Sequence, residues 1–234
     1  MPERLAYSFA FDLLFNGQDM DYCERPLSLG AFGKMPMFNE LPDRAKVGVI
    51  WPGGGRLIKS LLERGFSVDA FEGRMDCLNH LERHFGDNDA VTLHPISHLD
   101  DPMRRDKMRY DALFCMDDLR AFREFEEWTG FVQRMVRPDG YFVYSQVSNK
   151  LPTRKNQLAK YFKLSGSYNV SEETAALIRD SYMELEHWDP DDNVAEKRVA
   201  LKTLDMVKSA SSLRRGIMSG VKVSYVLWRR TQQN

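Results

Sequence analysis

The feature that most constrains the fold of this chain is a glycine triplet placed between an apolar segment and an amphipathic one. Residues 46–51, KVGVIW, are apolar and β-branched, and a proline and Gly53–Gly55 follow them, a pattern typical of a strand and a breaker. Residues 56–65 then carry leucine and isoleucine at helical spacing and close on a glycine. Residues 66–72, FSVDAFE, are the next strand candidate. This order predicts a βαβ unit in a parallel sheet.

The same alternation continues and predicts five parallel strands. The further candidates are helices over 75–86 and 122–136, and strands over 90–96, 110–116 and 137–147. The strands are nearly continuous apolar runs, which fits a sheet covered on both faces.

The two ends of the chain are less regular. Residues 148–169 are interpreted as a polar, basic insert with a short helical centre and a solvated helix face, while 183–188 and 221–230 are predicted as a late antiparallel pair of strands. Residues 1–45 are rich in aromatic side chains. We expect them to form a helical lid, anchored on the sheet and with a mobile loop around 17–38, ahead of a single α/β domain over 46–234.

The glycine run also predicts a ligand site. A backbone without Cβ can turn sharply and approach a ligand closely, and open α/β sheets bind ligands at the carboxyl ends of their strands. Glu72 ends the second strand candidate, 17 positions after Gly55, where its carboxylate can accept hydrogen bonds from two ribose hydroxyls. A tight turn beside a solvated glutamate is the plainer interpretation. Loop and acid together favour a nucleoside-containing ligand.

These residues resemble a known family. Residues 46–74 are similar to the first two motifs of the class I S-adenosylmethionine-dependent methyltransferases, 110–119 to their fourth-strand motif, and 137–147 to their turn into the fifth strand. The resemblance covers about residues 46–230. It implies a three-layer, Rossmann-like α/β fold of about seven strands, mostly parallel with an antiparallel final strand. It also implies S-adenosylmethionine as cofactor, S-adenosylhomocysteine as product, and a small-molecule acceptor, for which natural-product or secondary metabolism is one setting.

The resemblance carries the family's cofactor contacts onto residues of this chain. Gly53 and Gly55 match loop glycines beside the methionine part of the cofactor, and Glu72 matches the ribose acid. Ser97 falls where the family often has an aspartate for the adenine amino group. The complete predicted set is Trp51, Pro52, Gly53, Gly54, Gly55, Glu72, Gly73, Ile96, Ser97, Met116 and Asp117.

Three positions depart from the family pattern. Val49 stands at the usual acid of the first strand, Trp51 at the first loop glycine and Ser97 at the adenine aspartate. Trp51 could stack on a ligand or fill the core. The departures motivate two alternatives: a non-catalytic regulatory domain that works through a partner, and a non-methylating member of the fold, such as an aminopropyl-type transferase. An NAD-dependent Rossmann enzyme fits less well, because GGGRLIKS lacks the G-x-G-x-x-G spacing.

Methyl transfer is an in-line displacement, so an enzyme must align the nucleophile and sometimes remove a proton. The candidates for this role near the expected site are His98, Asp118, His187 and Tyr22. Histidine titrates close to neutral pH and can act as a base, although a lone histidine is more often a surface or hydrogen-bonded residue. Asp117 and Asp118 fit a helix cap better than a metal site, and we predict no metal.

Charge and composition argue against several classes of function. The chain has 33 basic and 34 acidic residues, without the basic excess expected for binding nucleic acid or an anionic membrane. No apolar run approaches the ~18 residues of a membrane span, and no signal peptide is recognised. Three scattered cysteines favour a reducing, cytoplasmic setting. We therefore expect a small-molecule partner and no nucleic acid or membrane, and leave a homodimer open.

Overall fold

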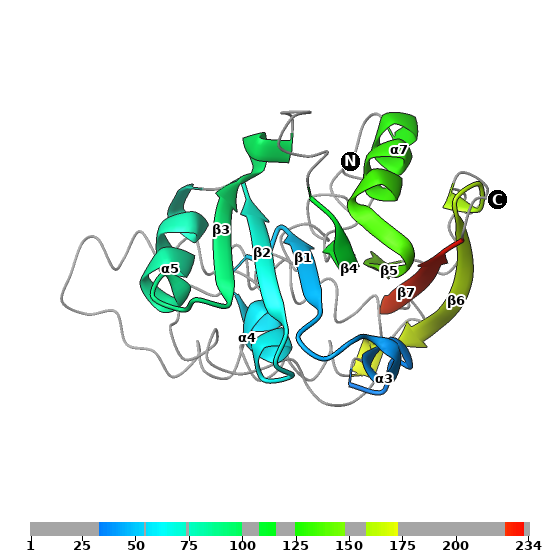
Figure 1. Cartoon of the computed structure of the whole chain (residues 1–234), viewed down its shortest axis with the longest axis horizontal. Helices are drawn as coiled ribbons and strands as arrows, with labels where there is room; N and C mark the ends of the chain where they lie inside the picture. Colours follow the sequence, from blue (N-terminus) through cyan, green and yellow to red (C-terminus); the bar gives the residue numbers. More distant parts are fainter. Residues whose placement is uncertain are drawn as a thin grey trace.

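A mixed sheet lies at the centre of the computed structural model, which describes residues 33–53, 55–73, 75–99, 108–115, 125–147, 158–172 and 223–231. Within these ranges the sheet has seven strands in the order β3-β2-β1-β4-β5-β7-β6 (Figure 1). The strands are β1 (Lys46–Ile50), β2 (Ser67–Glu72), β3 (Val91–Pro95), β4 (Tyr110–Cys115), β5 (Val136–Val147), β6 (Phe162–Asn169) and β7 (Val223–Arg230). The helices are α3 (Met37–Glu40), α4 (Arg56–Leu62), α5 (Met75–Phe85), the 3-10 turn η1 (Ile96–Leu99) and α7 (Phe125–Met135).

The strand directions confirm the predicted α/β class. β1 pairs in parallel with β2 and β4, and the outer pairs β2–β3 and β4–β5 are also parallel. β7 runs antiparallel to both of its neighbours, β5 and β6. β7 therefore lies between β5 and β6, and β6 forms one edge of the sheet.

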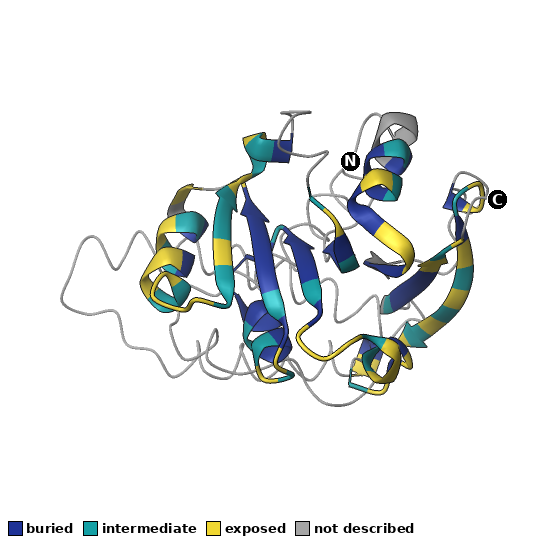
Figure 2. Cartoon of the chain, viewed as in Figure 1, coloured by how far each residue is buried: buried dark blue, intermediate teal, exposed yellow. Residues whose placement is uncertain are grey.

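Apolar residues from alternate strand positions form a core on each face of the sheet, because neighbouring side chains of a strand point to opposite faces. Val47 and Val49 of β1 belong to one cluster with Leu57 and Leu61 of α4. Ile50 belongs to the other cluster, which includes residues of α7. Figure 2 shows that β1 and β2 are buried along most of their length. The central strands are thus covered on both sides, as their continuous apolar runs predict.

Residues 162–169 correct the sequence analysis, since they form strand β6 rather than part of a helical insert. Their burial alternates along the strand, and Lys163 lies at an exposed position. The physical reason is the place of β6 at the edge of the sheet, where one face meets solvent and polar residues occupy every second position. The sixth strand predicted over 183–188 lies outside the described residues.

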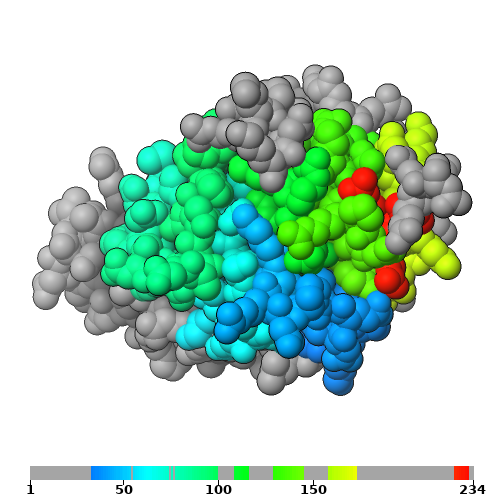
Figure 3. Space-filling view, viewed as in Figure 1, coloured from blue at the N-terminus to red at the C-terminus, as the bar shows by residue number. Residues whose placement is uncertain are grey.

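The end of the N-terminal segment packs on the sheet. Met35 and Met37 lie within the loop predicted around 17–38, yet both are buried in the core. In α3, Oε2 of Glu40 accepts hydrogen bonds from the Tyr141 hydroxyl at 2.5 Å and from the Arg229 guanidinium at 3.2 Å. Burial, and then the bond to Glu40, raise the pKa of Tyr141 to about 12. Figure 3 shows this segment in blue on the lower part of one face; residues 1–32, with the rest of the predicted lid, lie outside the described ranges.

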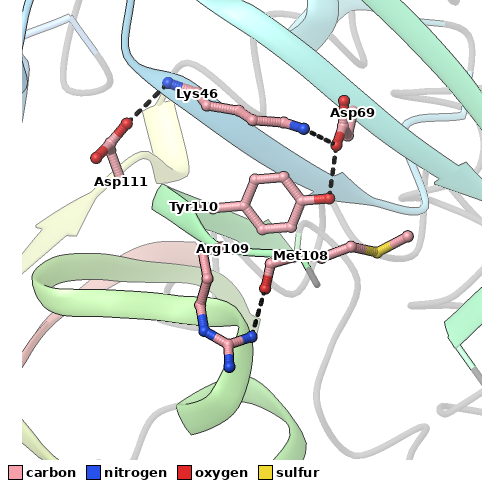
Figure 4. A network of polar contacts seen from close by, with 6 residues as sticks. All are labelled: Lys46, Asp69, Met108, Arg109, Tyr110 and Asp111. Carbon is pink, nitrogen blue, oxygen red and sulfur yellow. Dashed lines mark hydrogen bonds and ion pairs between the residues drawn. The ribbon is translucent and has the colours of Figure 1, made fainter. Parts of the chain in front are cut away.

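A polar network joins the amino-terminal halves of the central strands (Figure 4). The buried carboxylate of Asp69 accepts a hydrogen bond from the Tyr110 hydroxyl at 2.8 Å and pairs with the Lys46 ammonium at 2.7 Å. The Lys46 backbone amide donates to Asp111 at 2.8 Å, and Asp111 pairs with Arg137. Burial and the neighbouring Asp69 raise the pKa of Tyr110 well above its ordinary value. This network ties β1, β2 and β4 together near their amino-terminal ends, whereas the glycine loop follows the carboxyl end of β1.

Replacing Tyr110 by phenylalanine is expected to lower the free energy of unfolding by about 1–3 kcal/mol, because the buried Asp69 loses a hydrogen-bond donor. The measurement is urea unfolding at neutral pH, beside Tyr168→Phe on the edge strand β6 as a matched change. We expect Tyr168→Phe to stay within about 0.5 kcal/mol of the parent protein. Equal losses in the two variants would show that the Tyr110–Asp69 bond contributes nothing specific.

Candidate functional site

The carboxyl ends of β1, β2 and β3 lie at one edge of the sheet, because these strands are parallel. The glycine loop follows β1, Glu72 ends β2, and η1 begins at Ile96 directly after β3. The register places Ile50 beside Phe71 and Glu72 beside Pro95. The topology thus brings the sequence-predicted loop, acid and adenine-side residues to the same edge (Figure 1).

The loop after β1 turns through left-handed backbone conformations. Gly53 and Gly55 have φ values of 57° and 93°, and Trp51 has a φ of 55°. The Trp51 amide donates to the carbonyl of Phe71 at 2.8 Å, and the Gly55 amide donates to the carbonyl of Pro52 at 3.1 Å. Glycine adopts these angles without strain, so the sequence permits the sharp turn into α4.

Glu72 holds this loop to the end of β2. Its side chain is buried, with the residue only 4 % exposed. Oε2 accepts a hydrogen bond from the Gly53 amide at 3.2 Å, and Oε1 accepts one from the Gly73 amide at 2.7 Å. Each oxygen of the carboxylate thus accepts a hydrogen bond from one backbone amide. The acid lies against the loop instead of pointing into bulk water.

Close packing against α5 also disfavours a side chain at Gly55. A Cβ at this position would lie 2.5 Å from Cε2 of Phe85 and 2.9 Å from Cδ2 of Leu81. Both side chains come from α5, so the start of α4 packs closely against that helix. Close helix packing therefore requires this glycine, while its contact with a cofactor stays a prediction.

Trp51, Gly73 and Ile96 lie next to one another. A Cβ built on Gly73 would be 3.2 Å from Cγ2 of Ile96 and 3.7 Å from Nε1 of Trp51. Trp51 and Ile96 are both partly buried and pack against the same apolar cluster. Three residues that the sequence analysis placed in the cofactor site thus lie together just after the end of β2.

The two candidate polar residues of η1, one for the adenine and one for the general base, differ in burial. Ser97 is exposed and His98 is half-buried in η1. The His98 ring lies 5.5 Å from that of His94, and His94 stacks on Phe71 at 4.9 Å between ring centroids. The sequence analysis did not include His94 among the candidate residues. Its position just before the last residue of β3 could have placed it near the carboxyl ends of the strands.

Several predicted residues cannot be placed. Gly54, Met116, Asp117, Asp118, Tyr22 and His187 lie outside the described residues. Val49, at the family's usual acid position, is fully buried in the apolar core. Among the described side chains, no three or more of His, Cys, Asp or Glu are arranged to hold a metal ion. In the same ranges, no helix has the length and apolar character needed to cross a membrane.

Comparison with solved structures finds the same architecture in other proteins. A phosphoethanolamine N-methyltransferase of Haemonchus contortus in complex with S-adenosyl-L-methionine matches with a TM-score of 0.66 and 14 % identity, over 96 % of this chain and 56 % of that one. A cyclopropane synthase from Mycobacterium tuberculosis matches with a TM-score of 0.66 and 11 % identity, over 97 % and 95 % of the two chains.

A third match concerns a different chemistry. The cyclase SpnF has a TM-score of 0.64 and 11 % identity, over 99 % of this chain and 96 % of that one. No family model and no curated protein matches this sequence. At these identities the structural likeness establishes a shared fold, which is the Rossmann-like, seven-stranded one that the sequence motifs predict.

Proposed function

On the premise that this chain has the fold of the class I S-adenosylmethionine-dependent methyltransferases, we propose that it is such a methyltransferase acting on a small molecule. One observation carries the proposal: Glu72 is buried at the end of β2 and bonded to the amides of Gly53 and Gly73. A carboxylate fixed in this way is oriented before a ligand arrives, and preorganised hydrogen-bonding groups bind at lower entropic cost.

The residues at this edge suit a nucleoside. Glu72 would accept hydrogen bonds from the ribose hydroxyls, while Trp51 and Ile96 are apolar side chains next to the following residue, Gly73. Pro52, Gly53 and Gly55 are buried, so the hydrogen bond between Gly53 and Glu72 is shielded from bulk water, which strengthens polar contacts. When bound, S-adenosylmethionine supplies an activated methyl group on a sulfonium. The Haemonchus structure, which contains that cofactor, supports the proposal by its fold.

The first test is isothermal titration calorimetry of the purified chain with S-adenosylmethionine and S-adenosylhomocysteine. We expect saturable binding of both with dissociation constants below about 1 mM, the upper range of usual substrate constants. NAD serves as the control nucleotide and is expected not to bind. Absence of binding at millimolar S-adenosylhomocysteine would contradict the proposal, as would equal binding of NAD.

A second candidate is a non-methylating or regulatory protein of the same fold. Val49, which replaces the usual first-strand acid, is buried in an apolar cluster, and the cyclase SpnF has the same fold with a different named activity. The two candidates differ in product. With S-adenosylmethionine and a fractionated cell extract, methyl transfer releases S-adenosylhomocysteine, which mass spectrometry detects. Aminopropyl transfer from the decarboxylated cofactor would release 5′-methylthioadenosine, and a regulatory domain would bind without turnover.

The identity of a general base stays a prediction. β3 and β4 are separated by β2 and β1 in the sheet, so their ends lie about 14 Å apart at normal strand spacing. His98 follows β3, whereas the family resemblance places the sulfonium at the end of β4. This separation argues against His98 as the base, and Asp118, His187 and Tyr22 stay the predicted candidates. We further propose a cytoplasmic protein that binds no nucleic acid; a homodimer stays an open prediction.

A further inference from the structure

Trp51 adopts a backbone conformation that its side chain disfavours. Its φ of 55° lies in the left-handed region, where a bulky residue is an outlier that costs about 1–2 kcal/mol. The hydrogen bond from its amide to Phe71 fixes the residue at the end of β1. Strained residues of this kind concentrate at ligand-binding sites, where the strain positions a group.

The indole lies beside Gly73, the residue directly after the carboxylate that we assign to the ribose. Nε1 of Trp51 is 3.7 Å from the point where a Gly73 Cβ would be, and Cγ2 of Ile96 is 3.2 Å from the same point. The Gly73 amide in turn donates to Glu72 at 2.7 Å. Because a nucleobase is attached to the ribose carbon next to the 2′-hydroxyl, a sugar held by Glu72 brings its base into this neighbourhood.

We propose that the Trp51 indole provides the aromatic surface on which the adenine base of the cofactor stacks, so that this chain recognises adenine by π-contact. The inference rests on the proposed function and adds a specificity-determining residue to it. An aromatic side chain tolerates any base orientation in its plane and needs no carboxylate partner. Stacking thus offers a physical role for a tryptophan in a chain that has Ser97 where the family often has an aspartate.

The test compares two ligands that differ only in the base. S-adenosylhomocysteine carries adenine, and S-ribosylhomocysteine has the same sugar and amino acid without it. Base stacking on an aromatic side chain is worth about 1–3 kcal/mol, so Trp51→Leu is expected to weaken S-adenosylhomocysteine binding about tenfold or more. The same variant should change S-ribosylhomocysteine binding less than twofold. Trp51→Phe, which keeps an aromatic ring, should retain most of the affinity for both.

Trp228→Phe is the matched control, because Trp228 is buried in the core on β7 and should leave both affinities unchanged. Circular dichroism confirms that each variant is folded. Equal weakening of both ligands in Trp51→Leu would overturn the proposal, because the indole would then shape the loop only. Tighter binding in Trp51→Leu would also overturn it and show that the indole obstructs the site. If the parent protein binds neither ligand, the proposed function itself fails.

Discussion

Replacing Glu72 with alanine is expected to weaken S-adenosylhomocysteine binding by at least about 100-fold. Each hydrogen bond to a charged group is worth about 1.5–3 kcal/mol, and the proposed ribose contacts number two, so the expected loss is about 3–6 kcal/mol. The variant also removes the acceptors for the Gly53 and Gly73 amides. Calorimetric titration measures the affinity, and a thermal melt confirms that the variant folds.

Two further variants separate the charge from the shape of Glu72. Glu72→Gln keeps the size of the side chain but turns a donor group toward one of the two glycine amides, so we expect an intermediate loss of affinity. Glu63→Gln makes the same change at an exposed position just after α4 and should not alter binding. A folded Glu72→Ala protein that binds the ligand like the parent would remove the basis of the proposed function.

Replacing Gly55 with alanine is expected to lower the free energy of unfolding by about 2–5 kcal/mol. The φ of 93° adds the left-handed penalty of about 1–2 kcal/mol, and the new methyl group would meet Phe85 at 2.5 Å and Leu81 at 2.9 Å, an overpacking cost of about 1–3 kcal/mol. For a chain of this size the melting temperature should fall by roughly 4–20 °C. Differential scanning calorimetry measures the change.

Gly65→Ala isolates the backbone part of that effect. Gly65 also has a left-handed φ, 77°, but a Cβ there would have no heavy atom within 4 Å. Its expected cost is therefore the conformational penalty of about 1–2 kcal/mol alone. If the two alanine variants lose equal stability, the close contact between α4 and α5 is not what requires glycine at position 55.

Local sequence pattern predicted most of the fold because each element carries its own signal. The apolar run and glycine stop around β1 and α4, and the acid at the end of β2, lie within 27 residues of chain, 46–72. Strand β6 was missed because its alternation of apolar and polar residues is short, and because lysine and serine at its polar positions resemble a solvated insert. The decisive fact about β6, its place at the edge of the sheet, is a property of the assembled fold and not of the segment.

The sequence by itself determined that a glycine turn follows one strand and that a glutamate ends the next one. Both features are local, because strand patterns and breaker residues lie within short segments of the chain. Only the tertiary structure decided what each residue does there. It shows Gly55 packed against α5, Glu72 bonded to the loop amides, and the Trp51 indole beside Gly73 and Ile96. These contacts join residues up to 45 positions apart, from 51 to 96, and their geometry depends on how the sheet and helices pack, which no short pattern encodes.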